Sequence, residues 1–201
     1  MIHFARLVLV LAVAGLAALL GAAPAAAQTT AYAGGSPIVL SIPVTASVGG
    51  RCGFAEGAAP SGTYRQENFD KQGLSNNFAF ALNCTGPSRV AVVSSNGALV
   101  APGSVATGYT ARAGYDVTLN LVASDGKTTA NATCAASTLT AGGACSFRGP
   151  ASTAQGLRLA AASANQAGSY VRVSAPPVTS GPQLVAGTYT DTLTITLSVA
   201  P

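Results

Sequence analysis

The sequence is poor in charge, in histidine and in large aromatic residues. Its 201 residues include ten Lys and Arg, six Asp and Glu, one histidine and no tryptophan. The few cations are scattered, whereas a nucleic-acid-binding surface gathers Lys and Arg on one face. We therefore expect no nucleic-acid ligand. Polar surface must come from Ser, Thr, Asn, Gln and Gly, a composition common among secreted β-proteins.

The position of the single histidine excludes most catalytic chemistry. His3 lies in an N-terminal segment with the three parts of a signal peptide: a short basic opening that includes Arg6, an apolar run over residues 7–20, and Ala25-Ala26-Ala27 as an A-x-A cleavage site. We assign residues 1–27 to this signal peptide and expect the mature chain to begin at Gln28. A retained membrane anchor is the alternative, but the apolar run is shorter than the roughly 20 residues that a spanning helix needs. Without histidine, the mature chain cannot build Ser-His-Asp or Cys-His catalysis.

Two other sequence patterns with catalytic precedents are better explained as loops. Residues 124–127 (Ser-Asp-Gly-Lys) fit the S-x-x-K spelling of serine acylases, but Asp-Gly is typical of a turn after a strand. Glu67 and Asp70 could form a carboxylate pair, yet Arg65 and Lys71 flank them in a polar stretch. We therefore expect no catalytic residue, no small-molecule substrate and no enzyme.

Four cysteines remain in the exported chain, an even number in a compartment that permits oxidation. We expect disulfides between Cys52 and Cys84 and between Cys134 and Cys145, because each pair is the nearest in sequence. The alternative is a zinc site. It would have to use all four thiolates, since no C-x-x-C pair and no mature histidine exist. We expect no metal and no cofactor.

Apolar and polar residues alternate with period two along most of the chain, which predicts strands. Such runs cover residues 78–84, 89–95, 115–121, 170–174 and 193–199, and Asn96-Gly97 predicts a hairpin turn with residues 98–100 returning beside the preceding strand. Short strands separated by Gly, Pro and Asn favour one all-β domain, an antiparallel β-sandwich with immunoglobulin-like topology as the first choice. We place this domain at residues 44–201. Residues 151–167 are rich in alanine and could hold a turn of helix.

The N-terminal part of the mature chain contains an unusually long alternating run. Apolar side chains occupy every second position at Ile38, Leu40, Ile42, Val44, Ala46 and Val48. Pro43 interrupts this run because it cannot donate a backbone hydrogen bond. We therefore divide the run into an N-terminal arm, residues 28–43, and a first domain strand from about Val44 towards Cys52. The apolar face of the arm has three alternatives: burial in its own domain, burial in another subunit, or no burial at all.

The end of the chain carries a family resemblance. Residues 186–196 read Ala-Gly-Thr-Tyr-Thr-Asp-Thr-Leu-Thr-Ile-Thr and resemble the A-G-x-Y-x-D-x-[LV]-x-[VI]-x signature that closes spore coat protein U domains, which resemble subunits of archaic chaperone-usher pili. An early cysteine after an alternating strand, here Cys52, and a second that closes a strand, here Cys84, agree with it. The second cysteine pair departs from the family pattern, and residues 127–170 match no part of it.

The resemblance implies an immunoglobulin-like domain that lacks its last strand. A periplasmic chaperone first fills the resulting groove, and the N-terminal arm of the next subunit then replaces it. The donor strand would present Ile38, Leu40, Ile42 and Val44, and the acceptor-groove edge strand would present Leu193, Ile195, Leu197 and Val199.

The expected function is that of a structural subunit of an extracellular pilus or spore-coat-like surface assembly, polymerising by donor-strand exchange and serving adhesion or biofilm formation. Its partners would be other copies or related pilus subunits, the periplasmic chaperone and an outer-membrane usher. It would pass through the periplasm to the cell surface. The alternative is a monomeric secreted or periplasmic β-sandwich binding module, in which the N-terminal strand completes its own sheet.

Overall fold

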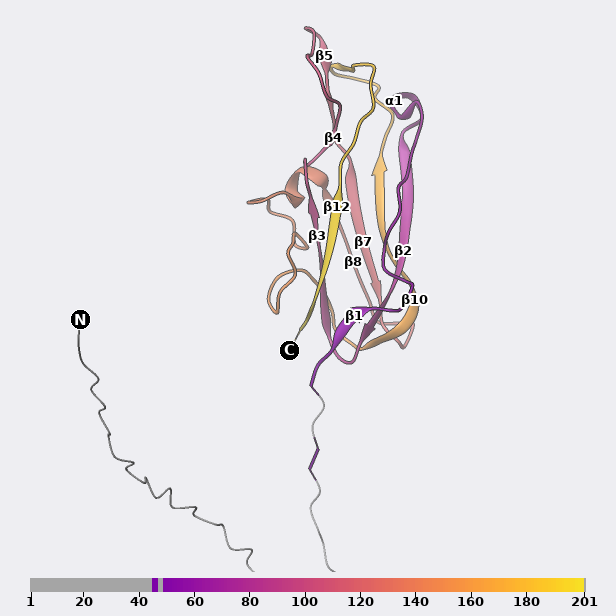
Figure 1. Cartoon of the computed structure of the whole chain (residues 1–201), viewed down its shortest axis with the longest axis vertical. Helices are drawn as coiled ribbons and strands as arrows, with labels where there is room; N and C mark the ends of the chain where they lie inside the picture. Colours follow the sequence, from indigo (N-terminus) through magenta and orange to yellow (C-terminus); the bar gives the residue numbers. More distant parts are fainter. Residues whose placement is uncertain (1–44, 47–48, 201) are drawn as a thin grey trace, which may run out of the picture. The chain divides into compact units, whose positions relative to one another are not determined.

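A computed structural model describes residues 45–46 and 49–200 of the chain. Residues 47–201 form one compact unit, separate from residues 1–46. The signal peptide, the arm at residues 28–43 and the donor-strand residues Ile38, Leu40, Ile42 and Val44 therefore lie outside the described residues. The compact unit is an all-β sandwich of antiparallel sheets, as the period-two alternation predicts (Figure 1).

The larger sheet has five antiparallel strands in the order β1-β2-β10-β7-β8. Their bounds are β1 Cys52–Phe54, β2 Leu74–Cys84, β10 Ser163–Ala175, β7 Asp116–Val122 and β8 Thr129–Ala135. Strand β7 alternates as a half-buried strand should: Val117, Leu119 and Leu121 are fully buried, and the residues between them are exposed or half-buried.

The smaller sheet has three antiparallel strands in the order β12-β3-β9. They are β12 Leu193–Val199, β3 Ser88–Ser94 and β9 Leu157–Leu159. Beyond β9, Val92 forms a parallel bridge with Arg148 on the same edge of β3. Both edges of β3 are thus occupied, and β3 is the most buried strand of the sheet.

Short elements complete the fold. They are α1 Phe69–Gln72, the 3-10 helix η1 Ala136–Leu139, the pair β4 Leu99–Val100 with β6 Arg112–Ala113, and the parallel pair β5 Tyr109–Thr110 with β11 Gln183–Leu184. Figure 1 shows β5 and α1 at one end of the sandwich, and β1 with the end of β12 at the other.

The core lies between the two sheets. Its largest fully buried side chains include Phe147, Leu82, Leu119, Leu121, Leu139 and Leu159. Each of two disulfides joins a buried core cysteine to a partly buried one. They join Cys52 to Cys84 and Cys134 to Cys145, the pairing expected from proximity in sequence. Cys52 lies directly opposite Cys84 in the β1–β2 ladder, so the first bridge fixes the start of the domain to the end of β2.

Two sequence-based predictions are wrong. Among the described residues, the first domain strand begins at Cys52 and not near Val44, since residues 45–46 and 49–51 belong to no strand. Residues 96–97 make a turn, with Gly97 at φ 68°, but no hairpin follows, since β4 pairs with β6 and not with β3. The physical reason is that both edges of β3 are already occupied near this turn. Strand β12 pairs with one edge as far as Ser94, and on the other edge Val92 is hydrogen-bonded to Phe147 and Gly149.

Strand β10 is longer than the sequence indicates. We expected residues 170–174, and the strand extends back to Ser163 through two register shifts against β2. Its first half, Ser-Ala-Asn-Gln-Ala-Gly-Ser, contains small and polar residues with no alternation, so the pattern gives no signal there. The alanine-rich stretch before it contains β9 rather than a helical turn.

Candidate functional site

Strand β12 is the candidate site, because it is an edge strand with one side unpaired. It pairs with β3 over its full length, from Leu193 opposite Ser94 to Val199 opposite Ser88. Among the described residues, no strand pairs with its other edge. Its bounds, Leu193–Val199, match the predicted acceptor-groove edge strand. A row of backbone N–H and C=O groups is thus available for another strand.

The apolar side chains of β12 are only partly covered. Leu193, Ile195 and Leu197 pack against the core, but all three are half-buried, and Val199 is 36% exposed. Val90 and Val92 on the neighbouring β3 are fully buried. The difference lies in the number of flanking strands, since β3 has partners on both sides and β12 has one. The uncovered side of β12 is therefore apolar as well as unpaired.

The opposite face of β12 is contacted at Thr196. The backbone N–H of Ala151 donates a hydrogen bond of 2.7 Å to the hydroxyl oxygen of Thr196. Thr194, on the same face, is exposed. Along the free edge, the backbone N–H and C=O groups have no strand partner among the described residues, and the apolar side chains are half-buried.

A hydrogen-bonded carboxylate fixes the start of β12. One oxygen of Asp191 accepts from the hydroxyl of Ser94 at 2.6 Å and from the hydroxyl of Tyr115 at 2.8 Å. The other accepts from the backbone N–H of Asn96 at 3.0 Å and of Thr192 at 2.7 Å. Four donors from three parts of the chain thus converge on one side chain.

The same group of bonds explains the turn at residues 96–97. Ser94 accepts at its hydroxyl oxygen from the backbone N–H of Gly97 at 2.8 Å, while Asp191 binds the N–H of Asn96. These turn N–H groups bond to side chains and not to a returning strand. The sequence pattern does not indicate this role for Asp191, although Asp191 is the Asp of the closing signature.

Tyr115 shows how enclosed this group is. The side chain is 7% exposed, and burial together with the neighbouring Asp191 carboxylate raises the pKa of its hydroxyl well above the ordinary value. A neutral phenol is required here, because only the protonated hydroxyl donates to Asp191. The bond therefore joins β7 to the start of β12.

Tyr189, the Tyr of the closing signature, positions the approach to β12. Its hydroxyl lies 2.9 Å from the carbonyl oxygen of Val185 and 3.1 Å from that of Thr110, and its ring meets Phe69 edge-on at 5.4 Å. Partial burial raises the pKa of its hydroxyl. Tyr189 thus links the β11 segment, β5 and α1 ahead of the free strand.

The chain enters the domain beside the far end of β12. A Cβ placed on Gly50 would lie 3.6 Å from Cγ1 of Val199, so this segment contacts the last residue of the strand. Gly49 and Gly50 are exposed. The domain therefore begins where the candidate acceptor strand ends.

Of the two patterns with catalytic precedents, residues 124–127 form an exposed turn, as expected, whereas the stretch with Glu67 and Asp70, expected to be a loop, includes a short helix. Asp125 closes the β7–β8 turn: its carboxylate accepts from the hydroxyl of Thr128 at 2.6 Å and from the N–H of Lys127 at 2.9 Å. These bonds, that from Thr128 first, lower the pKa of Asp125. Glu67 forms an exposed ion pair with Arg65 at 3.6 Å, and Asp70 lies in α1.

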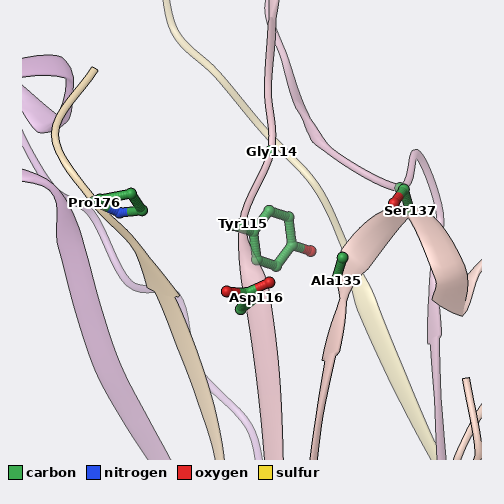
Figure 2. A pocket seen from close by; sticks show the side chains of 7 residues that line it. Gly114, Tyr115, Asp116, Ala135, Ser137 and Pro176 are labelled. Carbon is green, nitrogen blue, oxygen red and sulfur yellow. The ribbon is translucent and has the colours of Figure 1, made fainter. Parts of the chain in front are cut away.

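A shallow hollow of about 280 Å³ lies near Tyr115 (Figure 2). It is lined by Gly97, Gly114, Tyr115, Asp116, Ala135, Ser137 and Pro176. Its titratable groups are Asp116 and Tyr115, and the Tyr115 hydroxyl is already bonded to Asp191.

Within residues 45–46 and 49–200, no three His, Cys, Asp or Glu side chains are grouped to hold a metal ion. No helix in the same part of the chain has the length and apolar character needed to cross a membrane. No family model matches the chain, and no match was found among the curated proteins or the solved structures.

Proposed function

We propose that this protein is a structural subunit of an extracellular fibre or coat, and that it polymerises by donating its N-terminal arm to the free edge of β12 in a neighbouring subunit. The free edge is the observation that carries this proposal. It is both unpaired and lined by half-covered aliphatic side chains. A strand added there would complete the sheet and cover those side chains.

The strand order supports an immunoglobulin-like sandwich that lacks one strand. Immunoglobulin sandwiches place strands A, B, E and D in one sheet and C, F and G in the other. Here β1, β2, β10 and β7 take the places of A, B, E and D, while β3 and β12 take those of C and F. The vacant position is that of G, beside F, and this position is the free edge of β12.

The arm has the length and pattern that this edge requires. Residues 38–44 and residues 193–199 each span seven positions with an apolar side chain at every second one. Each of Ile38, Leu40 and Ile42 would contribute about 1.5–3 kcal/mol on full burial, before the cost of ordering the arm. Backbone hydrogen bonds along β12 add to this gain.

A subunit with such an edge needs cover before it assembles, because open strand edges and exposed aliphatic side chains lead to aggregation. A periplasmic chaperone that supplies a temporary strand meets that need, and an outer-membrane usher would then exchange it for the arm of the next subunit. This assignment agrees with the resemblance to spore coat protein U domains and with export through a signal peptide to the cell surface, where the polymer would serve adhesion or biofilm formation.

The test places charge on the apolar face of the arm. In cells that assemble the wild-type protein into polymer, the variant Leu40→Asp/Ile42→Asp should leave the domain exported and oxidised but abolish SDS-resistant ladders. The matched control is Val39→Asp/Ser41→Asp, which adds the same charge to the other face of the arm and should keep the ladders. Unchanged ladders from the first variant would count against the proposal. A single soluble band from the wild type would favour the monomeric binding module.

A further inference from the structure

Exposed apolar side chains gather at one end of the sandwich. Five large apolar side chains are exposed in the described residues, and four of them belong to segments around β5 and α1. We call these four the cap: Tyr64, Val105, Tyr109 and Val178. Tyr109 is the most exposed, at 50%, followed by Val105 at 43%. On a polar, weakly charged surface, such a group is typical of a binding surface.

Backbone contacts bring the segments that carry the cap to the same end of the sandwich. Tyr109 lies opposite Gln183 in the β5–β11 pair. The N–H of Val178 donates to the carbonyl of Asp70 in α1 at 2.7 Å. Three stretches of chain, far apart in sequence, thus meet at this end (Figure 1).

The fifth exposed apolar residue, Val199, lies at the opposite end. Strand β12 begins opposite Ser94, beside the cap end, and finishes at Val199 opposite Ser88. Arg51 and Thr85 are at the same far end, where the N–H of Thr85 donates to the carbonyl of Arg51 at 2.9 Å. We call Arg51, Thr85 and Val199 the base.

Chain length determines what faces the cap in a polymer. A donated arm that pairs antiparallel with β12, the more stable arrangement, places its Val44 beside Leu193 at the cap end. From Val44 the donor chain has eight residues to reach its own Cys52, which span at most about 29 Å when fully extended. The donor domain must therefore sit close to the cap, and its base is the part where that chain enters.

We propose that the cap is a second interface between consecutive subunits, and that it is occupied by the base of the copy that donates its arm. This inference rests on the proposed strand donation. The contact is head-to-tail, so it repeats along an open filament and does not close into a ring. It stiffens a polymer that would otherwise be joined only by a short connecting segment.

A photo-crosslinking experiment on assembled full-length polymer tests this interface. Tyr109 is replaced by p-benzoylphenylalanine, the polymer is irradiated, and crosslinked peptides are identified by mass spectrometry. The expected product joins Tyr109 to a peptide that contains Arg51, Thr85 or Val199 of another subunit. The matched control replaces Tyr170, a half-buried residue in the middle of the larger sheet, and should give no such peptide.

The outcomes separate this interface from strand donation. Ladders together with crosslinks from Tyr109 to the base support the interface. Ladders without those crosslinks overturn it and leave strand donation intact, whereas the absence of ladders from the wild type overturns both. In a second variant, Val105→Ser/Tyr109→Ser, ladders should persist while filaments in negative-stain images become more strongly bent. Filaments as straight as the wild type would contradict the interface.

Discussion

Asp191 makes the most bonds of any side chain near β12, and its neighbours show what each bond contributes. The carboxylate receives two hydroxyl donors, from Ser94 and Tyr115, and two backbone donors. Hydrogen bonds to a charged acceptor are stronger than neutral ones, and unpaired buried donors are costly. The residue thus sets the position at which β12 leaves its preceding loop.

The variant Asp191→Ala should lower the free energy of unfolding by about 2–4 kcal/mol, because it leaves the hydroxyls of the buried residues Ser94 and Tyr115 without their acceptor. Asp191→Asn should cost less, since its amide oxygen can still accept from the backbone N–H groups of Asn96 and Thr192. Urea unfolding of the mature protein measures both. Equal losses would show that the carboxylate does not organise this region through the bonds described.

Tyr115 gives the protein a specific response to alkali. Its pKa in the folded state is raised above the ordinary value of about 10, so the unfolded chain loses this proton first as the pH rises. The stabilising contribution is therefore complete below pH 10 and is lost progressively above it, by at most about 1.4 kcal/mol per pH unit. Urea midpoints between pH 8 and pH 11 should fall more steeply for the wild type than for Tyr115→Phe. Parallel curves would contradict this assignment.

At the scale of elements, period-two alternation located the strands where one face is apolar. It predicted β12 with its observed bounds and β7 to within one residue, because Leu, Ile and Val alternate there with Thr, Asn and Asp. It failed in the first half of β10, where small residues leave no pattern. It also failed after Asn96-Gly97, because tertiary bonds from Ser94 and Asp191 decide the path of that turn.

Part of the candidate site could likewise be predicted from the sequence, and part could not. The alternation indicated the apolar row of β12, but whether its edge is free depends on which strands pair, and that is a property of the whole sheet. Three of the four bonds of Asp191 connect positions 76 to 97 residues apart in sequence, so no local pattern contains them. The motif pointed to Asp191 and Tyr189 without revealing their partners.

The two disulfides should differ in what they contribute to stability. The bridge between Cys52 and Cys84 closes a loop with a sequence separation of 32, and that between Cys134 and Cys145 closes one of 11. Chain entropy predicts about 4 kcal/mol for the longer loop and about 3 kcal/mol for the shorter. Unfolding free energies of the paired alanine variants measure the difference. A larger loss from the shorter loop would contradict the entropic account.

At the scale of the whole molecule, the proposed assembly depends on which features lie at each end of the sandwich. The chain enters the sandwich beside Val199, the free edge extends along β12 to the opposite end, and the exposed apolar cap lies there. A molecule organised in this way has the chain entry at one end and the exposed apolar cap at the other. Repetition of one contact would produce a filament.

The central claim is that the arm of one molecule pairs with β12 of another, and crosslinking between two variants, each with one added cysteine beside the two native disulfides, tests it most directly. Ser41 is the midpoint of the donor run, and Thr194 is an exposed residue of β12. Co-expressed Ser41→Cys and Thr194→Cys subunits, treated with a short bismaleimide, should yield a crosslinked heterodimer, because each molecule carries only one of the two positions. If no heterodimer forms while the double variant crosslinks entirely within single chains, the arm pairs with its own domain and the account is wrong.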